Sequence, residues 1–135
     1  MKILSGLSNI PLSQKIVEIL SCHQVRAEIG RFSDGEISVE IQENVRGEDV
    51  FIVQSTSNPA AENLMELLII LDALKRASVH SANVVMPYFG YARQDRKTSA
   101  RSPITAKLVA DLLQTAGADR ILTIDLHANQ IQGFF

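Results

Sequence analysis

Short apolar runs of strand length alternate with helix-length segments along this chain, and this alternation limits its fold more than any other feature. Residues 50–53 (VFIV) form a continuous apolar run, as expected for a strand buried on both faces. Residues 83–86 and 121–126 are further strand candidates, and a segment with apolar residues at helical spacing lies between each run and the next. Strands alternating with helices predict an α/β domain with a mainly parallel sheet flanked by helices.

Apolar spacing predicts two helices in the first part of the chain. The first spans about residues 12–20, with Pro11 near its start. The second begins at Asn58–Pro59, interpreted as a cap followed by proline at the first helical position, and runs to about Ala77. This second helix is apolar on more than one side. That pattern fits a partner subunit or domain as well as it fits a helix sunk deep in one core.

A third helix is predicted to follow a polar loop over residues 88–101. It opens at Ser102–Pro103, again a cap followed by proline, and Gly117 stands where a C-terminal cap is expected. Its predicted apolar face includes the side chains of Ile104, Leu108 and Leu112.

Two further strand candidates, residues 27–30 and 37–41, flank the turn at Phe32–Glu36. Asp34–Gly35 readily takes the positive φ that such a turn needs. The exposed ring of Phe32 can stack on a base, and the carboxylates can accept hydrogen bonds from an exocyclic amine. By itself, however, the segment is a plain hairpin tip.

Composition excludes several classes of protein. The 135 residues suit one domain, and a net charge of −2 argues against a nucleic-acid-binding arm. The longest apolar stretch, Leu67–Leu71, ends at Asp72 and is too short to cross a bilayer. The start of the chain does not resemble a signal peptide. Cys22 is the single cysteine, which fits a core position and a reducing compartment, so we expect a cytoplasmic location.

The loop after the 83–86 strand gathers four cations, namely Arg93, Arg96, Lys97 and Arg101. In open α/β sheets ligands bind at the carboxyl ends of strands, and guanidinium groups suit phosphate oxygens. Gln94 in the same loop can both donate and accept. A solvated, charged loop is the other interpretation. Neither GxxxxGK[ST] nor GxGxxG occurs, so nucleotide binding would need less common means.

Asp125 and His127 stand two residues apart at the end of the last predicted strand. On a strand such side chains share a face, so both would point into one site. Asp125 is a natural oxygen ligand for Mg²⁺, whereas imidazole suits other metals better. His127 therefore fits a general base or a structural histidine equally well.

The chain resembles the ribose-phosphate pyrophosphokinases in six collinear motifs that span nearly its whole length. These motifs are Phe32–Glu36 (FSDGE), Glu43–Gly47 (ENVRG), Asn63–Leu67 (NLMEL), Tyr91–Arg96 (YARQDR), Pro103–Lys107 (PITAK) and Asp125–Ala128 with Gln130–Phe135 (DLHA, QIQGFF). The resemblance implies a Mg²⁺-dependent transfer of diphosphate from ATP to ribose 5-phosphate, giving PRPP and AMP. It also implies a homo-oligomer, a hexamer in that family, built from subunits with two type I phosphoribosyltransferase-like domains.

Within that resemblance, residues 1–135 match the N-terminal, ATP-binding domain, and the ribose 5-phosphate domain is absent. The matched ATP contacts are Phe32, Asp34, Gly35, Glu36, Arg93 and Gln94. In the family the hairpin carrying the first four reaches into a neighbouring subunit's site. His127 with Asp125 matches the Mg²⁺–ATP contact. Three residues match positions near the family's regulatory phosphate or ADP site, namely Arg46, Ser78 and Arg101.

The resemblance places no catalytic residue in this chain, because the family's catalytic lysine and arginine lie beyond residue 135. We therefore expect these residues alone to be inactive. Thr98 stands where some relatives carry an acidic residue. The apolar end, Phe134–Phe135, suggests a cut polypeptide or a docked segment. A noncatalytic regulatory paralogue is the alternative function, and a stand-alone nucleotide-binding module fits less well.

Overall fold

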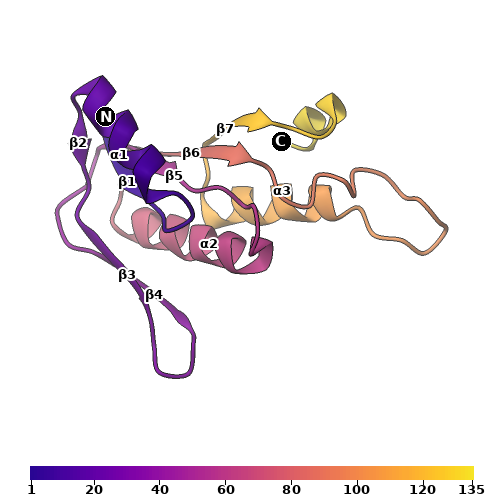
Figure 1. Cartoon of the computed structure of the whole chain (residues 1–135), viewed down its shortest axis with the longest axis horizontal. Coiled ribbons are helices and arrows are strands. Elements are labelled where there is room, and N and C mark those ends of the chain that lie inside the picture. Colours follow the sequence, from indigo (N-terminus) through magenta and orange to yellow (C-terminus); the bar gives the residue numbers. More distant parts are fainter.

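The computed structural model describes residues 1–135 and contains one main sheet, three α-helices and a protruding hairpin (Figure 1). Its elements, in chain order, are β1 (Lys2–Ser5), α1 (Ile10–Leu20), β2 (His23–Gln24), β3 (Ala27–Arg31), β4 (Ile37–Ile41), β5 (Asp49–Val53), α2 (Ala60–Arg76), β6 (Ser81–Tyr88), α3 (Thr105–Ala116), β7 (Arg120–Asp125) and the 3₁₀ helix η1 (Asn129–Phe134). No helix is both long and apolar enough to span a bilayer.

The main sheet has five parallel strands in the order β2-β1-β5-β6-β7, which confirms the predicted α/β architecture. The connections from β5 to β6 and from β6 to β7 step in one direction, whereas β1 to β2 steps in the other. Since parallel crossovers are right-handed, α2 and α3 cover one face and α1 covers the opposite face (Figure 1). Beyond α1 that second face stays open, and Ile124 on β7 is 80% exposed there.

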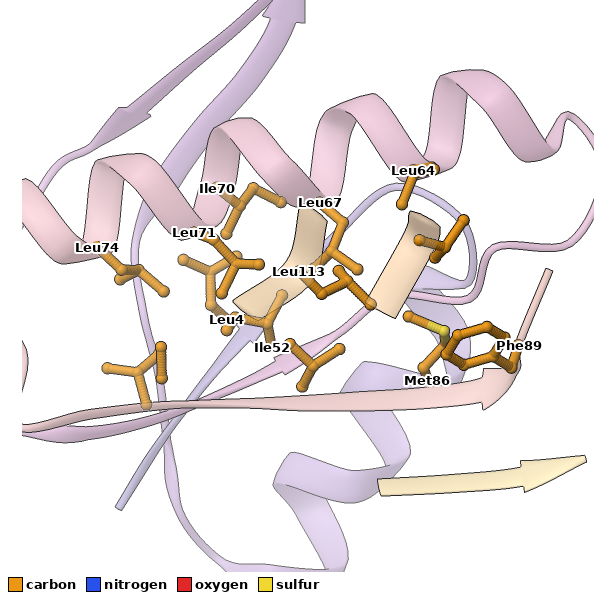
Figure 2. Packing of buried hydrophobic residues seen from close by; sticks show 14 of the residues in the cluster. Leu4, Ile52, Leu64, Leu67, Ile70, Leu71, Leu74, Met86, Phe89 and Leu113 are labelled. Carbon is orange, nitrogen blue, oxygen red and sulfur yellow. The ribbon is translucent and has the colours of Figure 1, made fainter. Parts of the chain in front are cut away.

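The core lies between the sheet and α2, as Figure 2 shows. Leu67, Leu71 and Leu74 of α2 are fully buried against strand residues such as Ile52. The sequence of α2 is apolar on a second side as well, and this side faces the hairpin. Helix α2 also contacts β4, and Met65 and Ile69 of α2 line a groove together with Ile37 of β4. A second element of the same chain therefore covers part of this side.

The predicted apolar face of α3 is wrong. Leu108 is 56% exposed and Leu112 is also exposed, and the buried positions are instead Ala106, Val109, Ala110 and Leu113. Both stripes have helical spacing. The stripe with small residues faces inward, since it lets α3 approach α2 closely.

Both predicted helix starts after a cap and a proline are also wrong. Pro59 itself is the N-cap of α2, because its ψ of 107° is extended, and Asn58 makes no capping bond. Helix α3 begins only after Ile104. The Ser102 hydroxyl is used inside the preceding loop, where it accepts from the amides of Thr98 and Ser99. The predicted C-terminal cap of α3 at Gly117 is confirmed, with φ at +113°.

Two further expectations need correction. Strand β6 continues through Pro87 to Tyr88 instead of ending before the proline. Pro87 is tolerated because it lies past Val85, the last β6 residue paired with β5, so its missing N–H leaves no gap in that ladder. Cys22 is half-buried in the turn after α1 and lies outside the main core.

The hairpin formed by β3 and β4 is a separate two-stranded sheet that projects from the domain (Figure 1). Its base is fastened by Glu43, which follows β4. The Glu43 carboxylate accepts from the Arg26 amide at 3.0 Å, lies 2.8 Å from His23 Nε2 and pairs with Lys2 Nζ at 3.3 Å. These bonds connect the hairpin to β1 and β2, and they set the direction in which the hairpin leaves the sheet.

Candidate functional site

The carboxyl ends of β5 and β6 are joined through Thr56, just after β5. The Thr56 hydroxyl accepts from the amide of Gly90 at 2.7 Å and lies 3.2 Å from the carbonyl oxygen of Tyr88. A side chain at position 90 would collide with the Thr56 carbonyl oxygen, only 2.3 Å from an added Cβ. The cation-bearing loop therefore leaves the sheet along a path that requires glycine at its first turn.

The same loop is tied to the segment after β7. The amide of Phe89 donates to the carbonyl oxygen of Asp125 at 3.3 Å, and Gln130 Nε2 donates to Asp95 Oδ2 at 2.5 Å. These two bonds hold the chain segments that carry Arg93 and His127 at one edge of the sheet. The sequence-predicted residues at this edge are therefore brought together, although no direct contact joins Arg93 to His127.

The cations of the loop are available for a ligand. Arg93, Arg96, Lys97 and Arg101 are all exposed, and none of them forms an ion pair within the chain. Four unpaired cations at the carboxyl ends of parallel strands suit a polyphosphate.

Gln94 is engaged with the start of α3. Its backbone carbonyl accepts from the amide of Ala106 at 3.1 Å, and its side-chain oxygen accepts from the hydroxyl of Thr105. This arrangement leaves only the side-chain NH₂ of Gln94 free to donate. Gln94 therefore connects the loop to α3 through hydrogen bonds, a structural role that the sequence did not indicate.

Asp125 and His127 lie at the same edge but do not share a strand. Strand β7 ends at Asp125, so His127 belongs to the turn that follows, and both side chains are exposed. No group of three or more acidic, histidine or cysteine side chains is gathered anywhere in the chain. The donor set still suits Mg²⁺, which keeps several water ligands and is commonly held by one or two carboxylates together with substrate phosphates. Asp125 is the residue of this pair that would hold it.

The hairpin tip has a defined shape. The Phe32 amide donates to the Glu36 carbonyl at 2.8 Å, and the Glu36 amide donates to Asp34 Oδ1 at 3.1 Å. Gly35 takes a φ of +93°, as predicted. The ring of Phe32 is 61% exposed and has no aromatic partner in the chain. Within one chain the tip lies apart from the loop that carries Arg93 (Figure 1).

The three residues predicted near a regulatory site do not meet within one chain. Ser78, with a φ of +58°, accepts through its carbonyl from the amide of Gly47, the neighbour of Arg46, at 2.9 Å. Ser78 precedes β6 and Arg46 precedes β5, so both lie at the amino end of the sheet. Arg101 lies in the loop after β6, at the carboxyl end.

A buried polar cluster between β1, β5 and α2 was missed by the sequence analysis. The Gln54 side chain is fully buried beside Gly6, and its oxygen accepts from the Ser8 amide at 3.1 Å. The Glu66 carboxylate accepts from the Leu7 amide at 2.7 Å, and burial raises the pKa of Glu66. This cluster fixes the turn after β1 at the carboxyl edge. The only sequence signal for this cluster was Gly6, which directly follows β1.

A cavity of about 430 Å³ opens between α3, β7 and η1. Its lining is mainly apolar and includes Phe89, Leu126 and Ile131, with Phe135 packed edge-on against Phe89 at 6.0 Å. The hydroxyl of Thr123 is buried without a partner. None of the four loop cations lines this cavity, so it is not the candidate phosphate site.

The fold and the cation-rich carboxyl edge define an open α/β domain of the parallel-sheet class. Residues 1–117 match the model of a family described as the N-terminal domain of ribose phosphate pyrophosphokinase. This chain belongs to that family, as the resemblance predicted.

Full-length relatives give the same result. The chain is 66% identical over 135 residues to the ribose-phosphate pyrophosphokinase of Caulobacter vibrioides, covering 100% of the chain and 43% of that protein. It is 63% identical to that of Fusobacterium nucleatum, covering 99% and 42%. The crystal structure of phosphoribosylpyrophosphate synthetase from Mycobacterium smegmatis matches with a TM-score of 0.96 at 46% identity, covering 99% of this chain and 45% of that one. The chain thus spans less than half the length of the relatives it matches.

Proposed function

We propose that this domain binds Mg·ATP as the nucleotide-binding half of a ribose-phosphate pyrophosphokinase. The complete enzyme would transfer the diphosphoryl group of ATP to ribose 5-phosphate, whose site lies in the half that this chain does not include. The observation that carries the proposal is the set of four exposed, unpaired cations in one loop at the carboxyl edge, beside Asp125 and His127.

The chemistry favours such an arrangement. Transfer of a phosphoryl group depends mainly on positioning and on neutralising charge, rather than on covalent catalysis by the protein. Arg93 can donate two parallel hydrogen bonds to phosphate oxygens. Mg²⁺, when bound, neutralises the phosphate charge, and the Asp125 carboxylate is the natural oxygen ligand for it at this edge.

The hairpin supports a site shared between subunits. Phe32 is exposed, and its tip lies apart from the cation loop of its own chain (Figure 1). We infer that the tip supplies the base contact to the site of a neighbouring subunit. The carboxylates of Asp34 and Glu36 and the carbonyl groups of the tip are acceptors that suit an exocyclic amine.

The first test is calorimetric titration of the chain with Mg·ATP. We expect weak binding, because the site would lack its second subunit and second half. Arg93→Ala should weaken that binding about tenfold, the scale of one charge-assisted hydrogen bond. Lys15→Ala removes an exposed cation on α1 that makes no ion pair, and it should leave affinity unchanged. Equal losses in the two variants, or no binding by the parent chain, would contradict the proposal.

A chimera tests the reaction. In it, this chain replaces the matching 43% of the Caulobacter vibrioides enzyme. The chimera should form PRPP, whereas the isolated chain should form none. Arg93→Ala in the chimera should raise the KM for ATP more than the KM for ribose 5-phosphate, and equal effects would refute its assigned role. A chimera that binds Mg·ATP but forms no PRPP would favour the noncatalytic regulatory paralogue.

A further inference from the structure

Arg31, the last residue of β3, connects the hairpin tip to a helix of the domain. Its Nη1 donates to the carbonyl oxygen of Gly35 at 3.0 Å, across the mouth of the turn. Its Nη2 donates to Glu62 Oε2, in the first turn of α2, at 2.5 Å. One guanidinium group thus holds two acceptors, one on the tip and one on the body of the domain.

This contact is the only side-chain hydrogen bond between the hairpin and α2. A hairpin of two strands is marginally stable by itself, so its direction depends on what anchors it. The base is anchored through Glu43, and the middle packs on α2 through partly buried apolar side chains. Nearer the tip, a groove of about 480 Å³ separates the hairpin from α2, and Arg31 and Glu62 bridge it.

We propose that Arg31 is a positioning residue for nucleotide binding. It shapes the tip that carries Phe32 and Asp34 and fixes the angle of this tip against α2, without touching the nucleotide. A planar guanidinium suits this role, because its rigid fork can reach two acceptors at once, as a lysine ammonium cannot do in the same geometry. The inference rests on the proposed function, because a fixed tip affects ATP binding only if the tip contacts the base.

The test separates positioning from direct contact by removing each partner in turn. Arg31→Ala removes the cation, whereas Glu62→Ala removes only its anchor on α2. If Arg31 acts by positioning, both variants of the chimera should raise the KM for ATP about two- to fivefold, the scale of one exposed ion pair, with little change in kcat. Arg31→Lys should give an intermediate KM. The matched control is Arg76→Ala, which breaks the exposed Arg76–Asp72 pair at the far end of α2 and should leave the KM unchanged.

Hydrogen exchange of the 135-residue chain supplies a readout that does not depend on ATP. The Phe32 amide, which bonds to Glu36, should exchange at least two- to threefold faster in both Arg31→Ala and Glu62→Ala than in the parent. Unchanged exchange in both variants would refute the positioning role. A raised KM in Arg31→Ala alone, with a normal KM in Glu62→Ala, would also overturn it, because that result means that Arg31 touches the nucleotide. Failure of the parent chimera and chain to bind Mg·ATP would instead refute the proposed function, so the two failures are distinguishable.

Discussion

Glu43 should control how the stability of this domain depends on pH. Its carboxylate accepts from the Arg26 amide and pairs with His23 and Lys2, and these contacts lower its pKa from 4.5 to about 2. A drop of this size corresponds to at most about 3 kcal/mol of folding free energy at neutral pH. The His23 and Arg26 side chains are largely exposed, so water screens their interaction with Glu43 and reduces this stabilisation. We therefore expect Glu43→Gln to lose about 1–2 kcal/mol at pH 7.

The sign of the pH effect follows from the lowered pKa. A carboxylate with a lowered folded pKa stabilises the native state above its unfolded value of 4.5, and this contribution disappears as the pH falls from 4.5 to about 2. The difference between parent and Glu43→Gln should therefore be full at pH 6–7 and should close in acid. Urea unfolding at several pH values measures it, with Glu18→Gln as a control on an exposed carboxylate that makes no ion pair. A difference that stays constant down to pH 3, or that is no larger than the control, would refute the reasoning.

Two further predictions concern the carboxyl edge. Gly90→Ala should cost about 1–3 kcal/mol, because its Cβ meets the Thr56 carbonyl oxygen at 2.3 Å, and Gly133→Ala, where an added Cβ meets nothing within 4 Å, should cost much less. Equal melting temperatures for the two variants would count against this. Because burial raises the pKa of Glu66, its stabilising contribution is present below pH 4.5 and is lost as the pH rises through the folded pKa. Glu66→Gln should therefore gain stability relative to the parent between pH 4.5 and 7, and a widening loss over that range in urea unfolding would contradict the prediction.

Local signals in the sequence predicted well wherever the structure is decided by neighbouring residues. The alternation of strands and helices, the hairpin around Gly35 and the cap at Gly117 are all confirmed. The carboxyl-edge position of Arg93 and His127 was also predictable, because parallel strands send the turns that follow them to one edge. The same rules failed at Asn58 and Ser102, where a cap followed by proline did not start the helix.

Contacts between distant segments could not be predicted in this way. The Asp95–Gln130 bond joins residues 35 positions apart, and the Arg31–Glu62 pair spans 31 positions. Neither pair has a spacing that singles it out from other polar residues in the chain. Each contact forms only because the sheet and α2 bring the two segments together.

The sequence alone determined where the main strands, helices and turns lie to within a few residues, and which side chains stand at the carboxyl ends of the strands. Only the tertiary structure decided which stripe of α3 is buried, how the hairpin is anchored to α2 and which polar groups share the carboxyl edge. The physical reason is that the spacing of apolar residues shows which faces of a segment could be buried. Close packing then selects among faces of equal periodicity, according to the shape of neighbours that lie far away in the chain.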